Sequence, residues 1–351
     1  MRPLLVAWAL LASAFTLVTL VRRARRPAPP GLRGAVPPVL LLRPGDRLTP
    51  RELATVATPV DWPARLDHVV LSPARPALPA GVRWLASDPA TPNRKVGHLL
   101  HALATFPHGG RVVCAVDADV AVDAELLAAL VAPVVAGAAL VTAAPEPLPA
   151  RGLGPRAVRA LLCHTHQSFD ALDAVSAGAK AVCGKAMALG PAAIAGLGAV
   201  RDRVGEDLEL AKWLHARGAA VVLAGARAPV PQVGHAPVGP AFDRFTRWMQ
   251  VLRAHRPALL PTVPLLLTPS LPLAVAALAV PTGPVVAAVG ALWLLRTLLA
   301  FRLERRGCLG WPLGEALLLA AFARALVRRT VVWRGRSFRV ARDGRMEPRA
   351  A

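Results

Sequence analysis

The sequence predicts an α/β domain with a mostly parallel sheet, set between an N-terminal membrane anchor and C-terminal membrane segments. Short apolar runs alternate with amphipathic helical stretches from about residue 37 to 235, as in a doubly wound sheet. An unbroken apolar stretch, residues 4–21, comes before this region, and three long apolar segments follow it. The hydrophobic content of 54% and the mean hydropathy of +0.45 over 351 residues fit a membrane-bound protein with one medium-sized domain.

The N-terminal stretch is expected to be a retained anchor. Residues 4–21 have about the length that spans a bilayer, and the basic run Arg22-Arg23-Ala24-Arg25-Arg26 follows at once. A secretory signal has the reverse order, with its charge before the apolar run and small residues after it. By the positive-inside rule, the N-terminus faces outward and the chain beyond residue 22 is cytoplasmic. Residues 27–37 form a linker rich in Pro and Gly.

The strong positive charge is not expected to mean nucleic-acid binding. The net charge is +21, but Lys occurs only four times, Tyr is absent, and Ala, Arg and Pro are abundant along the whole chain. Part of the basicity is therefore compositional, and no basic helix carries the interleaved aromatic residues of a nucleic-acid reader. Anionic lipid is the expected partner of exposed Arg, at about 1 kcal/mol per residue near the surface. The four cysteines are widely spaced without a CxxC pair, so neither a disulfide framework nor a zinc site is expected.

Five short apolar runs in the α/β region indicate buried parallel strands. Helical stretches lie between them: Asn93 caps one, another begins at Asp123 or the next residue, and a third spans 206–217 and ends at Gly218. The expected strands are residues 39–42, 68–71, 112–116, 138–142 and 220–223.

The region after the α/β domain is expected to lie in or on the membrane. Residues 243–255 form an amphipathic helix suited to the membrane interface. Of the three apolar segments that follow, the first contains four prolines and is expected to be broken or re-entrant. The third carries Glu315 and Arg324, which need protein contacts in lipid. The three segments are residues 258–280, 284–301 and 311–327.

These features divide the chain into five parts. Three full spans would place the basic tail outside, against the charge rule, so one segment is expected to be re-entrant or interfacial and the tail cytoplasmic. A transporter is disfavoured because about 200 residues form a soluble domain. The parts are an N-terminal transmembrane anchor (1–26), the α/β domain (37–240), an amphipathic interface helix (241–257), a C-terminal membrane region (258–327) and a basic tail (328–351).

Asp117-Ala118-Asp119 ends the apolar run 112–116, at the strand end where a doubly wound sheet binds its ligand. An Asp-x-Asp pair in extended chain aims both carboxylates into one crevice. Because Mg²⁺ or Mn²⁺ on a diphosphate is held by one or two carboxylates together with phosphate oxygens, the pair is a candidate metal site. A solvated turn with a helix cap at Asp123 accounts for the same residues.

Glu206-Asp207 opens the third helix, after a glycine-rich stretch. Acids in this place cap a helix and complement its dipole, which explains the pair when it is taken alone. Alternatively, Asp207 is a general base that takes a proton from an acceptor hydroxyl.

Arg244-x-x-Arg247-Trp248 places two arginines on adjacent turns of the interface helix. Arg suits bidentate phosphate contacts, and Trp248 could stack on a sugar or anchor at the membrane. A basic amphipathic helix on anionic lipid accounts for these residues equally well, and both roles can hold. Together the three clusters supply what sugar transfer from a nucleotide donor needs: acids for a metal diphosphate, a base, and cations for the leaving group.

Taken in order, these residues resemble the ceramide glucosyltransferase family of inverting GT-A glycosyltransferases, whose bacterial members include enzymes tied to sphingolipids and hopanoids. The resemblance covers nearly the whole chain. The matching segments are residues 39–45 (first strand and Arg-Pro turn), 93–99 (similar to Asn-Pro-Lys-x-x-Asn-Leu), Asp117-Ala-Asp119, 182–187, Asp207, Arg244-x-x-Arg247-Trp248 and Trp333-Arg334-x-Arg336.

The resemblance implies a GT-A fold and transfer of a hexose, from UDP-glucose, to a lipid hydroxyl such as that of ceramide, with inversion. It implies a UDP-sugar, a lipid acceptor and a membrane as partners, no nucleic acid, and a catalytic domain on the cytoplasmic face of a bacterial inner membrane. The implied roles are Asp207 as base, Asp117 and Asp119 as ligands of Mg²⁺ or Mn²⁺ on the donor diphosphate, Arg244, Arg247 and Trp248 at the leaving group and acceptor, and Lys95, Lys185 and Glu206 in support.

One position departs from the family pattern. The family has an acid just after its second strand, at the nucleotide base, but here residues 69–71 are followed by Ser72-Pro73-Ala74-Arg75. Asp88 or backbone groups could compensate. Two alternatives stay open: a hopanoid or diacylglycerol glycosyltransferase that uses another UDP-sugar, and a catalytically silent membrane protein of the same fold, which the missing acid favours.

Overall fold

The computed structural model divides the chain into two compact units. It describes residues 1–25, 35–148, 152–175, 182–231, 238–304, 308–328, 330–333 and 336–348. The helical unit consists of Met1–Arg26, Pro147–Val175 and Gln232–Val331. The sheet unit consists of Pro27–Glu146, Ser176–Pro231 and Val332–Ala351. The linker expected at 27–37 and Arg334 of the C-terminal motif lie wholly or mostly outside the described residues.

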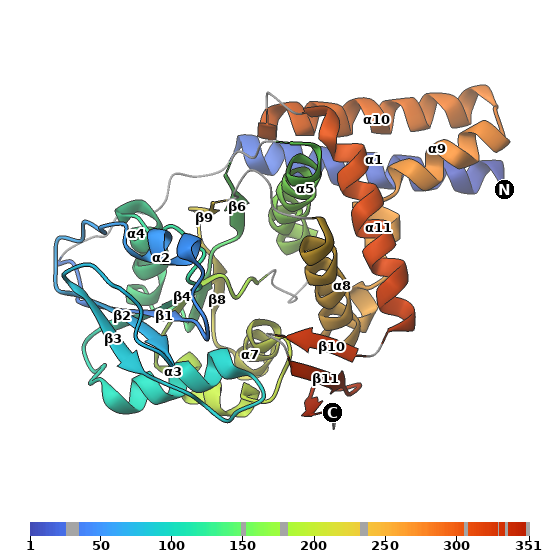
Figure 1. Cartoon of the computed structure of the whole chain (residues 1–351). Coiled ribbons are helices and arrows are strands. Elements are labelled where there is room, and N and C mark those ends of the chain that lie inside the picture. Colours follow the sequence, from blue (N-terminus) through green and yellow to red (C-terminus); the bar gives the residue numbers. More distant parts are fainter. Residues whose placement is uncertain are drawn as a thin grey trace. The chain divides into compact units, whose positions relative to one another are not determined.

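A seven-stranded sheet forms the centre of the sheet unit (Figure 1). Every strand runs parallel to the others except β7, which is antiparallel to both of its neighbours. All five strands expected from the sequence are present, and β3 and β7 are additional, so the predicted mostly parallel α/β fold is confirmed. In sheet order the strands are β3 (Val82–Ala86), β2 (Leu66–Ser72), β1 (Val39–Pro44), β4 (Val112–Val116), β7 (Ala186–Leu189), β5 (Leu140–Thr142) and β8 (Val221–Leu223).

Helices cover both faces of this sheet, because successive side chains of a strand point to opposite faces. Leu41 and Cys114 pack in the cluster that contains α4. Leu40 and Leu42, one position away, pack on the other face with α3, α6 and α7. Both faces are therefore apolar, which is why the strands appear in the sequence as continuous apolar runs. The helices are α2 (Pro50–Val56), α3 (Arg94–Thr105), α4 (Ala124–Val135), α6 (Pro191–Gly196), the 3₁₀ turn η1 (Leu197–Val200) and α7 (Glu206–His215).

The helix starts expected at Asn93 and Asp123 are confirmed, whereas α7 ends at His215, two residues before the expected position 217. The Asn93 side chain accepts a hydrogen bond from the amide of Val96 at 3.2 Å, and Asp123 accepts one from Leu126 at 2.8 Å. After α7, Gly218 takes a φ of +69°, the left-handed conformation that commonly ends a helix. Local signals sufficed here because a cap and its helix are adjacent in the chain.

A long excursion of the chain precedes the antiparallel strand β7. After β6 (Pro145–Pro147), which pairs with β9 (Ala228–Val230), the chain contributes α5 (Leu153–Val175) to the helical unit. Residues 147–175 thus belong to the helical unit, although the sequence grouped them with 37–240. On its return, β7 begins beside the carboxyl end of β4, where the Asp117 amide donates to the carbonyl of Lys185 at 2.8 Å.

The segment expected only as a basic tail is largely folded. It contains a three-stranded sheet of β10 (Thr330–Trp333), β11 (Arg336–Val340) and β12 (Met346–Pro348). Its last strand joins the sheet unit, because the Met346 amide donates to the carbonyl of Asp202 at 2.8 Å. Residues on either side of 232–331 therefore belong to one folded unit.

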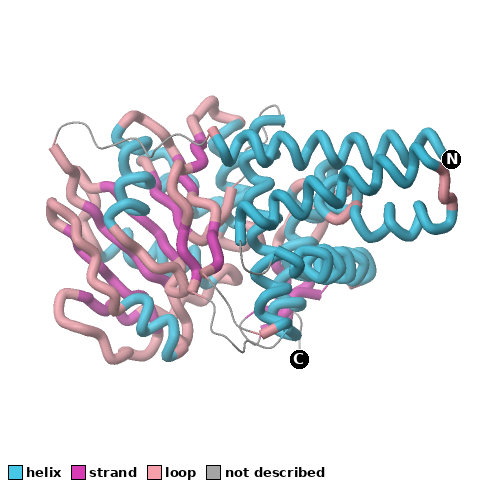
Figure 2. Tube along the Cα trace, turned by 90° about the horizontal axis from the view of Figure 1, so that it is seen from above, coloured by secondary structure: helices cyan, strands magenta, loops and turns pink. Residues whose placement is uncertain are grey.

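The helical unit contains two helices long and apolar enough to span a membrane, within the residues described. They are α1 (Arg2–Ala24) and α10 (Gly283–Glu304), which run side by side with α9 (Figure 2). Small residues of α1, Ala9 and Ala12, pack with Val285 and Leu292 of α10. A second bundle within the unit consists of α5, α8 (Val238–His255) and α11 (Trp311–Val327).

The expected broken segment lies between α8 and α10. A 3₁₀ turn (Pro257–Leu259), a π-helical turn (Val263–Leu267) and α9 (Ser270–Ala279) follow one another, with a bend of 57° at the break. Arg296 of α10 donates to the carbonyl of Leu266 on one side of the break. Glu315 of α11 accepts from the amide and hydroxyl of Ser270 on the other side, both at 3.1 Å. Protein groups thus satisfy the backbone where the helix stops, as an apolar environment requires.

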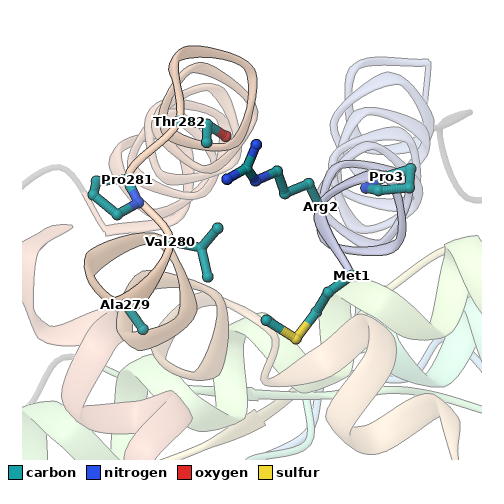
Figure 3. A pocket seen from close by; sticks show the side chains of 7 residues that line it. All are labelled: Met1, Arg2, Pro3, Ala279, Val280, Pro281 and Thr282. Atoms are coloured by element: carbon teal, nitrogen blue, oxygen red, sulfur yellow. The ribbon is translucent and has the colours of Figure 1, made fainter.

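A cavity of about 620 Å³ lies beside the N-terminus of α1, between the start of that helix and the turn after α9 (Figure 3). The Arg2 side chain extends into it beside Val280 and Thr282. Its lining contains no carboxylate and none of the site residues expected from the sequence.

Removing Glu315 should destabilise the helical unit far more than removing a surface acid. The Arg296–Glu315 pair is 2% and 4% exposed at 3.7 Å, and its loss would leave Arg296 buried with an unpaired charge. We expect Glu315→Ala to cost about 3–5 kcal/mol, measured by thermal unfolding in detergent. Asp243→Ala is the matched control, because Asp243 pairs with Arg324 at 2.7 Å but is 65% exposed, and should cost at most about 1 kcal/mol. Equal losses in the two variants would contradict this role of Glu315.

Candidate functional site

Charged side chains gather at the carboxyl end of β4, the edge at which parallel sheets bind ligands. Asp117 follows the last residue of β4, and Asp119 comes two residues later in a turn closed by the Val120 amide on the Asp117 carbonyl at 3.1 Å. Both carboxylates are partly exposed, at 28% and 21%. The acid pair thus lies where the sequence predicted it, accessible to a ligand.

Arg43 of β1 holds this turn from behind. It is 1% exposed, and its Nη2 lies 2.7 Å from the carbonyl oxygen of Val120 and 3.1 Å from those of Asp117 and Ala118. Burial lowers the pKa of Arg43 to about 10, against the opposing effect of Asp119 and Asp117, so the guanidinium stays charged at neutral pH. A fixed cation therefore supports the loop that carries both acids.

Two lysines from distant segments contact the acid pair. Lys185, just before β7, places its Nζ 2.7 Å from both carboxylate oxygens of Asp119 and 3.2 Å from Asp117. Lys95, in the first turn of α3, places its Nζ 2.8 Å from the other oxygen of Asp117. These contacts lower the pKa of Asp117 to about 2, although burial alone would raise it.

Lys95 also reaches the second acid pair. Its Nζ lies 3.4 Å from Glu206 and donates to the carbonyl of Gly184. Glu206 is fixed from the other side by Asn93, whose side-chain amide donates to it at 3.0 Å. The pKa of Lys95 is raised by Asp117 and Glu206 even though burial opposes this. One ammonium group thus joins the end of β4, the turn before β7 and the start of α7.

Asp207 has a pKa that lies closer to neutral pH than that of an ordinary aspartate. Loss of solvent raises its pKa to about 6, Glu206 adds to this, and Lys95 opposes it. Its carboxylate accepts from the amide of Gly184 at 2.7 Å and from that of Leu208 at 2.9 Å. A carboxylate oxygen keeps a second lone pair after one such bond, so Asp207 can accept a proton from a ligand.

The charges of this cluster leave an excess of negative charge. Four carboxylates face the two ammonium groups and the buried guanidinium of Arg43. A nucleotide diphosphate would add about two more negative charges, so a divalent cation fits here better than the lysines alone. No group of three His, Cys, Asp or Glu side chains suited to a metal occurs among the residues that can be described. Two carboxylates suffice, however, when phosphate oxygens complete the coordination.

The turn after β2 and the neighbouring strand ends carry different polar groups. Ser72 donates to the carbonyl of Ala74 at 2.8 Å, and the Trp84 indole donates to Ser72, so this turn offers no carboxylate. Arg94 bonds to Asp88, after β3, and to Asp46, after β1, each at 2.5 Å. Asp88 is 71% exposed, so the only acid that the sequence suggested as compensation remains open to a ligand.

The third cluster belongs to the helical unit. Arg244, Arg247 and Trp248 lie on α8, as expected, and Trp248 packs edge-on against Phe245 with ring centroids 5.4 Å apart. The two acid pairs and the lysines that contact them belong to the other unit, the sheet unit.

Three features of the site were not assigned a role from the sequence. Arg43 offered a signal, because a charged residue inside an apolar strand must find buried partners. Asn93 was expected only as a helix cap, and its second bond to Glu206 joins positions far apart in the chain. Gly184 contributes backbone groups, which no sequence motif reveals; a Cβ there would lie 3.2–3.3 Å from the charged atoms of Glu206, Asp207 and Lys95.

Comparisons with known proteins identify the family. A model described as glycosyl transferase family 21 matches residues 76–346. Among solved structures, the mannosyltransferase PcManGT from Pyrobaculum calidifontis, in complex with GDP-Man and Mn²⁺, is similar over 92% of this chain and 99% of that one, at 19% identity and a TM-score of 0.49. A mycobacterial protein is similar over 62% of this chain and 72% of its own, at 16% identity and a TM-score of 0.34. No curated protein matches the sequence.

The family match extends over most of the chain, from before α3 to β12, and therefore includes both acid pairs and the two lysines that contact them, while Arg43 precedes it. It agrees with the family that the motifs resemble. The chain belongs to glycosyl transferase family 21 and is a glycosyltransferase.

Proposed function

We propose that this glycosyltransferase transfers a hexose, glucose from UDP-glucose, to the hydroxyl of a lipid such as ceramide, with inversion at the anomeric carbon. The observation that carries the proposal is the Lys95 bridge between the acid pair after β4 and the start of α7, where the pKa of Asp207 is near 6. It joins a site suited to a diphosphate with an acid suited to proton removal at neutral pH.

Asp207 acts as the general base in this proposal. Its carboxylate takes the proton of the acceptor hydroxyl while the hydroxyl oxygen bonds to the anomeric carbon. The bond from that carbon to the diphosphate oxygen breaks on the opposite side, and UDP leaves with the electron pair. The amides of Gly184 and Leu208 orient the base, so its remaining lone pairs face a fixed direction.

Asp117 and Asp119 hold the donor diphosphate through Mg²⁺ or Mn²⁺. When bound, such a cation neutralises the charge that develops on the leaving diphosphate. Lys185 and Lys95, which contact these carboxylates, are proposed to bind the phosphate oxygens as well. Arg43 keeps the loop in place when these contacts rearrange.

Arg247 and Arg244 are proposed to stabilise the departing UDP, and Trp248 to contact the sugar or the membrane. Their placement on one amphipathic helix supports the two roles together, since cations and an aromatic ring alternate with buried Phe245 and Met249. Asp88 is the proposed contact for the nucleotide base, in place of the acid absent after β2.

The apolar helices α1 and α10 support a membrane location, which we propose is a bacterial inner membrane with the sheet unit in the cytoplasm. The basic residues Arg22 and Arg23 in the last turn of α1 favour this side, and the C-terminal strand β12 belongs to the sheet unit. A cysteine at position 342 should then resist an impermeant thiol reagent in intact cells. Its modification there would contradict the orientation.

A silent protein of the same fold is the second candidate, favoured by the turn at Ser72 that lacks an acid. Release of UDP from UDP-glucose in the presence of a lipid extract separates the two candidates, because a silent protein releases none. Substituting purified ceramide, hopanoid or diacylglycerol for the extract then identifies the acceptor class.

Replacing Asp207 tests the proposed base directly. Asp207→Asn keeps the size of the side chain but cannot take the proton, so UDP release should fall about 100-fold or more. Binding of UDP-glucose, measured by calorimetry, should stay within about threefold. Glu209→Gln is the control, because Glu209 lies in the same turn of α7 and pairs with Lys212. Retained turnover in purified Asp207→Asn protein would remove Asp207 from this role.

Lys95 should control the pH at which the base becomes active. Activity requires ionised Asp207, so kcat/KM should rise with pH through about 6 in the native enzyme. Lys95 lowers the pKa of Asp207, so Lys95→Met should move this rise to higher pH and reduce the plateau. Lys212→Met should leave the profile unchanged, since Lys212 pairs with Glu209 on the surface. An unshifted profile in Lys95→Met would show that Lys95 does not act on the base.

A further inference from the structure

The last strand of the chain lies against the loop that precedes the proposed base. The Val204 amide donates to the carbonyl of Gly344 at 3.1 Å, and the Met346 amide donates to the carbonyl of Asp202 at 2.8 Å. Arg203 and Arg345 face each other in an antiparallel bridge. All of these residues belong to the sheet unit. The segment Asp343–Met346 is called the C-terminal clasp below.

Side chains reinforce this backbone pairing. Arg203 lies 2.5 Å from the carbonyl of Asp343 and 3.0 Å from its carboxylate. The Arg345 guanidinium lies 3.7 Å from the carboxylate of Asp202. Met346 is 2% exposed, so the clasp also buries an apolar side chain. The clasp is therefore packed into the sheet unit, because it buries Met346 and forms backbone hydrogen bonds on both sides of Arg345.

The opposite side of the same loop is held by the start of α3. The Asn93 amide donates to the carbonyl of Arg201 at 3.0 Å, and its side chain donates to the carbonyl of Arg203 at 2.9 Å. The same side chain donates to Glu206. The loop of residues 201–205 is therefore fixed between Asn93 and the clasp, and Asp207 follows it within two residues.

We propose that the C-terminal clasp is a positioning element for the base: it fixes the loop from which α7 starts and thereby the direction of the Asp207 carboxylate. This inference rests on the proposed function of Asp207. A loop held only at Asn93 would be free to move on its outer side, and a misplacement of about 1 Å can reduce turnover about 100-fold. The basic C-terminal segment then has a role in catalysis at a distance, without contact with donor or acceptor.

The test compares three variants of the full-length protein. Met346→Pro removes the amide that donates to Asp202, whereas Met346→Leu keeps that amide and the apolar side chain. Gly344→Ala strains the same place more mildly, because Gly344 has a φ of +80°. The measurements are hydrogen exchange of the amides of residues 202–208, kcat, and KM for UDP-glucose.

We expect Met346→Pro to speed hydrogen exchange at the amides of Val204 and Leu208. It should lower kcat about tenfold or more and leave the KM for UDP-glucose within about threefold of the native value. In Met346→Leu, exchange, kcat and KM should all equal those of the native protein. If Met346→Pro fails to fold, Gly344→Ala decides through smaller shifts of the same kind. Unchanged exchange, or kcat and donor KM altered together, would overturn the proposal. If the native enzyme transfers no sugar, the proposed function fails, whereas the exchange comparison still decides whether the clasp holds the loop.

Discussion

The rest of the site depends on the ion pairs of Lys95 with Asp117 and Glu206. The Lys95 ammonium contacts Asp117, Glu206 and the carbonyl of Gly184, and so joins three segments that are far apart in the chain. Its charge keeps Asp117 ionised and limits how far the pKa of Asp207 rises. Without it, three carboxylates at close range would repel one another and the acid pair would separate from the base.

The antiparallel strand β7 makes this arrangement possible. A seventh parallel strand would bring its carboxyl end, not its beginning, to the edge where Asp117 lies. Because β7 enters at that edge, Lys185 and Gly184 lie beside the acid pair, and the Gly184 amide meets Asp207. Between β5 and β7 the chain passes through β6 and through α5, which belongs to the helical unit.

What could be predicted from the sequence were features that depend on near neighbours. The buried strands show as apolar runs, Asn93 and Asp123 as helix caps, and the proline-rich apolar segment as a broken helix. The ordering of the acid clusters, with the family resemblance, indicated the candidate site residues. The contacts among them depend on the direction of β7 and on the return of the C-terminal strand, neither of which leaves a local signal. The strand β3 was missed because its residues are half-exposed. The strands β10, β11 and β12 were missed because the many arginines of the C-terminal segment interrupt any apolar run.

The central claim is that the acid pair after β4 receives a nucleotide diphosphate together with a divalent cation. Calorimetric titration of UDP-glucose into the purified full-length protein tests it most directly, with and without Mg²⁺ or Mn²⁺, in the native protein and in the Asp117→Asn/Asp119→Asn double variant. The account predicts binding that requires the cation and is lost in the double variant. Equal binding in the double variant, or binding indifferent to the cation, would contradict it.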